Sequence, residues 1–240
     1  MLRRYLPEGG PRIIADVGCG TGQLTRQLAI EFPGARIIGM DASSAMIDSA
    51  RAAAASAGVG PGAGVRYAVA PAEDLSGVLG GEPVEVLTVA TAFHWFDREA
   101  ALREFHRVLV PGGVFMAVSI TEPRLGPGFA AWWEKETAGA WAPYRHPKLE
   151  RYFELVEVLE APGWFEPLEI IDLDHPATMT LGEFYGWITT TSFGAPASRA
   201  EGVDAYRRRV LGEWSGILPR DLDAPLEVGF RLFGRVQRRR

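Results

Sequence analysis

A glycine-rich stretch near the amino terminus constrains the fold of this chain more than any other feature. The apolar run Ile13–Val17 has the pattern of a buried strand, and it leads directly into Gly18, Gly20 and Gly22. Leucines at helical spacing come next, so the glycines stand where a strand turns into a helix. Glycine suits such a turn because its backbone reaches dihedral angles that other residues avoid, and because no Cβ stops a ligand from approaching. The first amides of the following helix favour an anionic or polar ligand there.

An acidic residue at the next strand end indicates what kind of ligand this turn binds. Asp41 follows a second apolar run, residues 36–40, and lies about 20 residues after the glycines. A carboxylate at that place accepts hydrogen bonds from the two hydroxyls of a ribose. Together the two features predict a nucleoside-bearing ligand at the carboxyl edge of a parallel sheet. A glycine turn that binds no ligand is the alternative.

The spacing of the glycines bears on which nucleoside is bound. A dinucleotide-binding turn has the pattern G-x-G-x-x-G, whose third glycine lets helix and strand pack closely around a pyrophosphate. In this chain Gln23 occupies that sixth position, and Asp16 precedes a G-x-G-x-G pattern. The spacing therefore favours S-adenosylmethionine over NAD, and an NAD-dependent oxidoreductase is the less favoured alternative.

Short apolar runs alternate with helical patterns through the first half of the chain. This alternation is typical of parallel strands joined by crossover helices. Asp97 is the predicted N-cap of one such helix, and Ser43 or Ser44 is the predicted N-cap of another. The strands predicted here cover residues 13–17, 36–40, 65–69, 84–90 and 114–120.

The second half changes in character and contains several tryptophans among prolines and glycines. Its patterns predict strands over residues 168–174 and 228–236 and helices over residues 148–160, 181–191 and 200–214. No repeat or low-complexity linker divides the chain, so we expect one domain, 1–240. Its expected parts are a cofactor-binding core (1–120), a lid with substrate-side elements (121–220) and a final strand (221–240).

The composition argues against several classes of partner. The formal net charge is −5 and the arginine clusters at 207–209 and 238–240 are short, so nucleic acid is not an expected partner. Cys19 is the only cysteine, which excludes an internal disulfide and fits a reducing compartment. No stretch approaches the roughly 20 apolar residues that cross a bilayer. We therefore expect a soluble, cytoplasmic protein. We also expect no metal, because the four histidines form no cluster with cysteine.

Several segments between residues 12 and 120 match a known family in order and spacing. They are residues 16–22, Asp41, residues 71–75, residues 92–97 and residues 107–113. In these segments the chain resembles the class I S-adenosylmethionine methyltransferases, of the small-molecule type that includes trans-aconitate methyltransferase. The resemblance implies an α/β fold with a Rossmann-like, doubly wound and mostly parallel sheet of seven strands, the last one antiparallel. It also implies a helical lid from the C-terminal half, although the region after residue 120 matches only loosely.

The resemblance also implies which residues bind S-adenosylmethionine. Gly18, Gly20 and Gly22, preceded by Asp16, would lie against the methionine part and the ribose of the cofactor. Asp41 would hold the ribose hydroxyls. The other cofactor-binding residues would border the adenine (Ala42, Met46, Ala72 and Glu73) or face the methionine part (Ala90 and Thr91).

Some positions allow a second explanation or depart from the family. Met46 falls on the predicted inner face of its helix with Ile47 and Ala50, so core packing would also explain it. Pro71 stands where many members have an aspartate that accepts a hydrogen bond from the adenine amine. Glu85 stands where an aspartate is common in the fourth strand. Members usually carry a longer segment before the first strand.

The reaction of this family needs alignment of donor and acceptor and exclusion of water more than a dedicated nucleophile. His94, beside Trp95 just after the fourth strand, is the proposed catalytic residue, as a base or by orienting the substrate. Anchoring of the turn by packing is the alternative for His94. We expect O-methylation of a carboxylate or hydroxyl of a small molecule; the alternative is a non-catalytic cofactor-binding protein. Aromatic residues that could line an acceptor pocket, or pack the lid, are Trp132, Trp133, Trp141, Tyr144, Tyr185 and Trp187.

Overall fold

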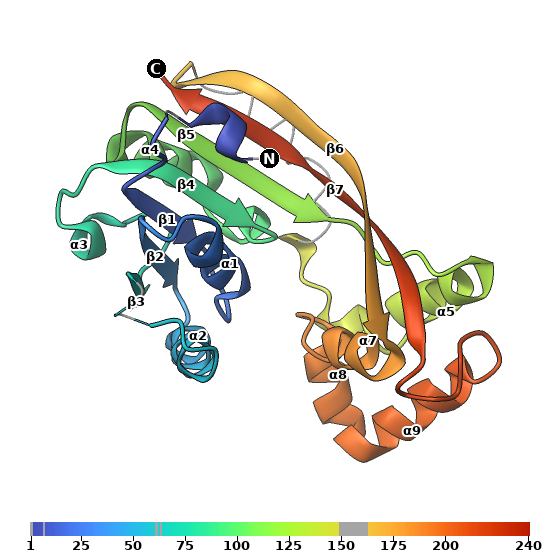
Figure 1. The fold of residues 1–240 in the computed structure, drawn as a ribbon. Helices are drawn as coiled ribbons and strands as arrows, with labels where there is room; N and C mark the ends of the chain where they lie inside the picture. Colours follow the sequence, from blue (N-terminus) through green and yellow to red (C-terminus); the bar gives the residue numbers. More distant parts are fainter. Residues whose placement is uncertain (1, 7, 61, 63, 149–162) are drawn as a thin grey trace. The chain divides into compact units, whose positions relative to one another are not determined.

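The computed structural model describes the chain except for residues 1, 7, 61, 63 and 149–162. The described residues contain a seven-stranded sheet in the order β3-β2-β1-β4-β5-β7-β6 (Figure 1). Its strands are β1 (Ile13–Val17), β2 (Arg36–Asp41), β3 (Val65–Val69), β4 (Val84–Ala90), β5 (Leu109–Ile120), β6 (Phe165–Thr180) and β7 (Pro225–Arg239).

The sheet confirms the predicted Rossmann-like arrangement. The pairs β1–β2, β2–β3, β1–β4 and β4–β5 are all parallel. Figure 1 shows β7 running opposite to β5 and β6 on its two sides, so the last strand is antiparallel as expected. The chain leaves β1 for β2 on one side and later returns to β4 on the other, and sheets of this type bind ligands at the carboxyl ends beside this reversal. That edge follows Val17, at the start of the glycine turn.

The helices begin where the sequence predicts caps. The Ser43 hydroxyl accepts the amide of Met46 at 3.4 Å, and the Asp97 carboxylate accepts the amide of Ala100 at 3.1 Å, which confirms two predicted N-caps. The described helices are α1 (Gln23–Glu31), α2 (Ser44–Ser56), α3 (Ser76–Leu79), α4 (Arg98–Val108), α5 (Pro127–Ala138), α7 (Leu181–Ile188), α8 (Gly194–Glu201) and α9 (Val203–Trp214). Short 3-10 helices are η1 (Leu2–Tyr5), η3 (Phe93–Trp95) and η4 (Ala142–Tyr144).

The chain divides into two compact units, each with a hydrophobic core of its own. Unit 1 comprises residues 1–119, 151–172 and 233–240, and unit 2 comprises residues 120–150 and 173–232. The whole predicted cofactor site, from Asp16 to His94, therefore lies within unit 1.

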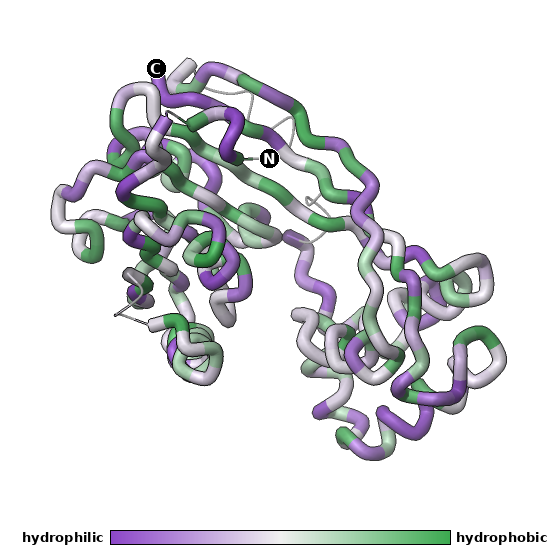
Figure 2. Tube along the Cα trace, viewed as in Figure 1, coloured by the Kyte–Doolittle hydropathy of each residue, from purple (hydrophilic) through white to green (hydrophobic). Residues whose placement is uncertain are grey.

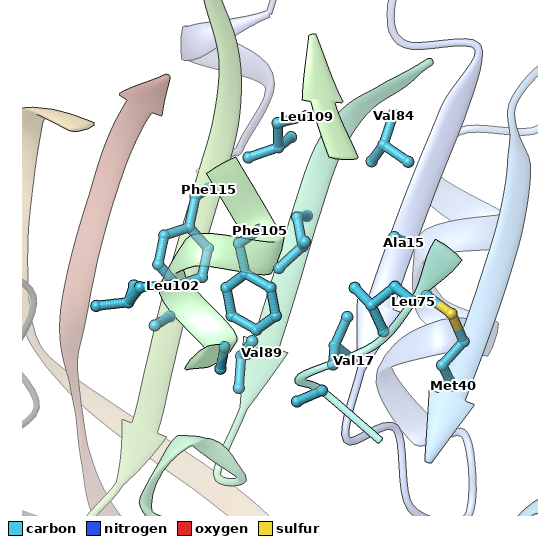
Figure 3. Close-up of a cluster of buried hydrophobic side chains, with 14 of the residues drawn as sticks. Ala15, Val17, Met40, Leu75, Val84, Val89, Leu102, Phe105, Leu109 and Phe115 are labelled. Atoms are coloured by element: carbon cyan, nitrogen blue, oxygen red, sulfur yellow. The ribbon is translucent and has the colours of Figure 1, made fainter. Parts of the chain in front are cut away.

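The core of unit 1 lies between the sheet and its helices. Figure 2 shows the central strands β4 and β5 as mostly hydrophobic, which fits strands covered on both faces. Phe105 of α4 and Phe115 of β5 pack edge to face with ring centroids 5.2 Å apart, and Leu102 and Val89 belong to the same cluster (Figure 3). An aromatic pair of this geometry contributes about 1 kcal/mol beyond the area that it buries.

Several element boundaries differ from the predicted ones. The single helix predicted over 200–214 is two helices, because Gly202 between α8 and α9 has φ of 92°. The strands β5, β6 and β7 are longer than predicted; β5 starts at Leu109, which pairs with Val84 across a bulge. Helix α5 was not predicted. The helix predicted over 148–160 falls, after its first residue, outside the described residues.

Candidate functional site

The glycine turn after β1 is built from three residues with positive φ, and packing explains two of them. A Cβ on Gly18 would lie 2.5 Å from the Cβ of Ala92, and a Cβ on Gly22 would lie 2.6 Å from the Tyr67 hydroxyl. Both glycines therefore allow close packing within the protein. A Cβ on Gly20, whose φ is 54°, would meet nothing within 4 Å. The space in front of Gly20 is thus open to a ligand, and this cradle fits the polar part of a nucleoside.

The glycine turn and Asp41, which were predicted to lie at the same edge of the sheet, are in direct contact. The amide of Gly20 donates to Asp41 Oδ2 at 2.9 Å, and the amide of Ser43 donates to Oδ1 at 2.9 Å. The half-buried carboxylate thus links the turn after β1 to the start of α2. Two carboxylate oxygens offer about four acceptor positions, so Asp41 retains capacity for hydroxyl donors.

Asp16 lies beneath the turn and not on its open side. Its side chain is 1% exposed, and its two oxygens accept the hydroxyls of Thr25 at 2.6 Å and Thr88 at 2.9 Å. These bonds tie β1 to α1 and to β4. Burial raises the pKa of Asp16 to about 6, against the lowering effect of the two hydroxyls. Neither threonine was predicted, because Thr88 is 72 residues away and no local pattern relates Thr25 or Thr88 to Asp16.

Replacing Asp16 with asparagine is expected to change how stability depends on pH. The pKa of Asp16 is about 6 in the folded protein and about 3.9 for an unfolded aspartate. The folded state therefore binds the proton more tightly, so this group's stabilisation is complete below about pH 4 and is lost as the pH rises through 6. The stability of Asp16→Asn relative to the wild type should rise by about 2 kcal/mol between pH 4 and pH 7. Urea unfolding at a series of pH values measures this difference; a pH-independent difference contradicts the assignment.

The side where the adenine was expected presents exposed apolar side chains. Met46 is 44% exposed, whereas Ile47 and Ala50 are buried, so the prediction that Met46 shares their inner face was wrong. Val69, at the end of β3, is 49% exposed and pairs in register with Asp41. Val69 was not among the predicted residues, although its position at a strand end beside β2 was the signal that could have found it. Met46 in the first turn of α2 and Val69 beside Asp41 are thus both exposed apolar side chains.

The remaining residues predicted to border the adenine differ in exposure and in hydrogen bonding. Ala42 is exposed, whereas Ala72 is buried. Glu73 is half-buried, and its Oε1 accepts the backbone amide of Asp97 at 2.7 Å. The Glu73 side chain is thus engaged at the start of α4.

The end of β4 brings the remaining predicted residues to the same edge of the sheet. Thr91 has φ of 54°, a strained value for a threonine, and its amide donates to the carbonyl of Val118 at 2.8 Å. Half-buried Ala90 precedes it. His94 lies in η3 and is 7% exposed, with its ring centroid 5.0 Å from that of Trp95. Strain at an exposed loop residue is typical of functional sites, where the surrounding fold holds a conformation that the residue alone avoids.

The aromatic residues of unit 2 mainly pack against one another. Trp132, Trp133 and Trp141 are buried in its core, and the indole of Trp141 donates to the Tyr206 hydroxyl at 3.0 Å. Tyr144, Tyr185 and Trp187 are half-buried against that core. Core packing thus accounts for much of this predicted set. A cavity of about 590 Å³ lies within unit 2 beside α5, with Arg124 and Trp133 among its lining residues.

None of the helices in the described part of the chain is both long and apolar enough to cross a membrane. Over the same residues, no three side chains of the His, Cys, Asp and Glu types are grouped so that they could hold a metal ion.

The sheet, the open glycine turn and Asp41 define a nucleoside-binding protein of the Rossmann-like class. A family model described as a methyltransferase domain matches residues 14–113. Trans-aconitate 2-methyltransferase of Paracidovorax citrulli is 30% identical over 141 residues, which are 58% of this chain and 50% of that protein. The enzyme of the same name from Methylobacterium radiotolerans is 28% identical over 232 residues, covering 89% of this chain and 83% of the relative.

A solved structure agrees with these sequence matches. A chain from Anaeromyxobacter dehalogenans, named as a candidate type II methyltransferase, superposes with a TM-score of 0.73 at 28% identity. The match covers 99% of this chain and 93% of that one. These comparisons support a class I methyltransferase that uses S-adenosylmethionine.

Proposed function

We propose that this chain transfers a methyl group from S-adenosylmethionine to a small-molecule acceptor, by O-methylation of a carboxylate or a hydroxyl. The observation that supports it best is the 2.9 Å contact between the Gly20 amide and Asp41, beside the exposed side chains of Met46 and Val69. A carboxylate with spare acceptor capacity next to an apolar surface suits a ribose attached to a planar base.

In this proposal the residues of unit 1 hold and orient the cofactor. When bound, S-adenosylmethionine supplies an electrophilic methyl group on a positively charged sulfur. Asp41 accepts the ribose hydroxyls, and Asp16 keeps the turn in shape from beneath. The other assigned residues contact the methionine part (Gly18, Gly20, Gly22, Ala90 and Thr91) or border the adenine (Ala42, Met46 and Ala72). Glu73 belongs to the segment beside the adenine, while its side chain binds the Asp97 amide.

The acceptor is proposed to be an acid, with an alcohol as the second possibility. Several relatives carry the name trans-aconitate 2-methyltransferase, which supports a carboxylate acceptor. A carboxylate has already lost its proton at neutral pH, so its methylation requires positioning and exclusion of water but no general base. A hydroxyl acceptor would need a base, for which we assign His94. Residues 121–220 are proposed to cover the substrate. We further propose a cytoplasmic location and no nucleic-acid partner.

Two measurements test this proposal. Isothermal titration should show binding of S-adenosylmethionine and S-adenosylhomocysteine and none of NAD. Incubation with S-adenosylmethionine and a panel of small carboxylic acids, including trans-aconitate, should give a methyl ester that mass spectrometry detects. A matched panel of alcohols tests the second acceptor class. Binding of NAD in preference to S-adenosylhomocysteine would contradict the proposal at its first step.

Replacing His94 with alanine separates its two proposed roles. If His94 acts on the acceptor, the rate of methyl transfer should fall by about 100-fold, within the usual contribution of a positioned base, while cofactor affinity stays within about twofold. Steady-state kinetics and titration with S-adenosylhomocysteine measure the two quantities. An unchanged rate would assign His94 to packing of the turn.

A further inference from the structure

The start of α4 has only half of a capping box within its own sequence. In a complete box, the N-cap side chain accepts the amide of the third helical residue, and a Glu or Gln there accepts the N-cap amide in return. Helix α7 has both bonds, between Thr180 and Glu183, at 3.1 and 2.7 Å. In α4, Asp97 accepts the amide of Ala100, but the side chain of Ala100 has no oxygen that could accept the Asp97 amide. The amide of Asp97 must therefore find a partner elsewhere.

Glu73 supplies this missing partner from another part of the chain. Its Oε1 accepts the Asp97 amide at 2.7 Å, the same length as the returning bond in α7. The bond is charge-assisted, and its negative charge lies at the positive end of a helix, so both effects strengthen it. Glu104 of α4 adds a second tie, since its Oε1 accepts the amide of Leu75 at 2.7 Å. The segment after β3 is thus joined to α4 at two places.

The connection between β4 and α4, residues 91–97, is held at both ends by parts of the cofactor site. Near its start, Ala92 lies so close to Gly18 that only a glycine fits there. At its end, Asp97 binds Glu73. His94 and Trp95 stand between these two points, in η3. The position of His94 therefore depends on contacts with two segments that are assigned to the cofactor.

We propose that Glu73 is a positioning residue that completes the capping box of α4 and thereby holds the connection carrying His94. The consequence for catalysis rests on the function proposed above, whereas the cap itself does not. Glu73 then contributes little to recognition of the adenine, although its segment borders the adenine site.

A suppressor substitution tests this inference. Glu73→Ala removes the acceptor, and a second change, Ala100→Glu, provides one from within α4 at the position where α7 has its own glutamate. Ala100 is half-exposed, so a longer side chain fits there. Glu99→Ala is the matched control, because Glu99 is a carboxylate in the same helical turn that binds Arg103 at 2.6 Å. Amide hydrogen exchange of residues 91–101 is measured with and without S-adenosylhomocysteine, whose affinity is measured by titration.

The expected pattern distinguishes a cap from an adenine ligand. Glu73→Ala should speed exchange at the start of α4 by about 3- to 10-fold, and the double variant should return it to within about twofold of the wild type. S-adenosylhomocysteine affinity should stay within about threefold in every variant, and Glu99→Ala should resemble the wild type. Unchanged exchange in Glu73→Ala overturns the inference. A loss of affinity that Ala100→Glu fails to restore also overturns it, in favour of an adenine ligand. Failure of the wild type to bind S-adenosylhomocysteine contradicts the proposed function alone, since exchange in the free protein still tests the cap.

Discussion

Asp41→Ala is expected to weaken binding of S-adenosylhomocysteine by about 10- to 100-fold. The substitution removes the acceptor for the ribose hydroxyls, which costs about 1–3 kcal/mol when the partners are left unmade. It also releases the amides of Gly20 and Ser43, which donate to the two carboxylate oxygens at 2.9 Å. The loss of affinity therefore combines a missing ligand contact with a less ordered turn. Isothermal titration measures the sum.

An analogue of the cofactor separates the two contributions. S-adenosylhomocysteine without its ribose hydroxyls cannot donate hydrogen bonds to Asp41, so the wild type should bind this analogue weakly. Asp41→Ala should then lower the affinity for the analogue much less than the affinity for the natural ligand. Asp48→Ala is the control, because Asp48 is an exposed carboxylate on α2, the helix that follows Asp41, and pairs with Arg51 at 3.4 Å. Equal losses for the natural and the dideoxy ligand would show that Asp41 orders the turn without contacting the sugar. Unchanged affinity for the natural ligand would refute the ribose assignment.

Arg209→Ala is expected to lower the free energy of unfolding of unit 2 by about 3 kcal/mol. Arg209 of α9 binds both oxygens of Glu136, at 2.7 and 3.2 Å, and also contacts Glu201 and Glu213. The side chain of Glu136 is only 3% exposed. Removal of the guanidinium leaves a buried carboxylate without its cation, and breaking a buried pair in this way typically costs about 3–5 kcal/mol. The partial exposure of Arg209 places the expected value at the lower end.

A double-mutant cycle checks this origin of the effect. Urea unfolding followed by tryptophan fluorescence reports on unit 2, whose core contains Trp132, Trp133, Trp141 and Trp214. Arg209→Ala combined with Glu136→Ala should cost less than the sum of the two single changes, because the double variant leaves no unpaired buried charge. Arg208→Ala, which removes the exposed neighbouring arginine, should change stability by less than about 0.5 kcal/mol. Strict additivity would mean that the network contributes little through charge pairing.

The two carboxylates of the cofactor turn show what a sequence pattern can predict. The contact between Asp41 and the turn was predictable, because the carboxyl ends of neighbouring parallel strands meet at one edge of a sheet. The position of the Asp16 side chain was not predictable from the sequence. Its place directly before the glycines led to its prediction as a cofactor-binding residue, and in the structure both of its oxygens accept hydroxyls, from Thr25 and Thr88. Thr88 lies in β4, 72 residues away, and only the pairing of β1 with β4 brings the two together.

What the sequence determined by itself is the set of elements whose signals are local. The apolar runs, the glycine turn and the caps at Ser43 and Asp97 each depend on a few neighbouring residues, so they indicated a Rossmann-like sheet and predicted where its site lies. The tertiary structure alone decided which polar side chains are held by other parts of the scaffold. Glu73 was assigned to the adenine by position, yet its carboxylate binds the amide of Asp97, 24 residues away. The direction of a polar side chain depends on donors that the fold brings close, and their distance along the chain hides them from any local pattern.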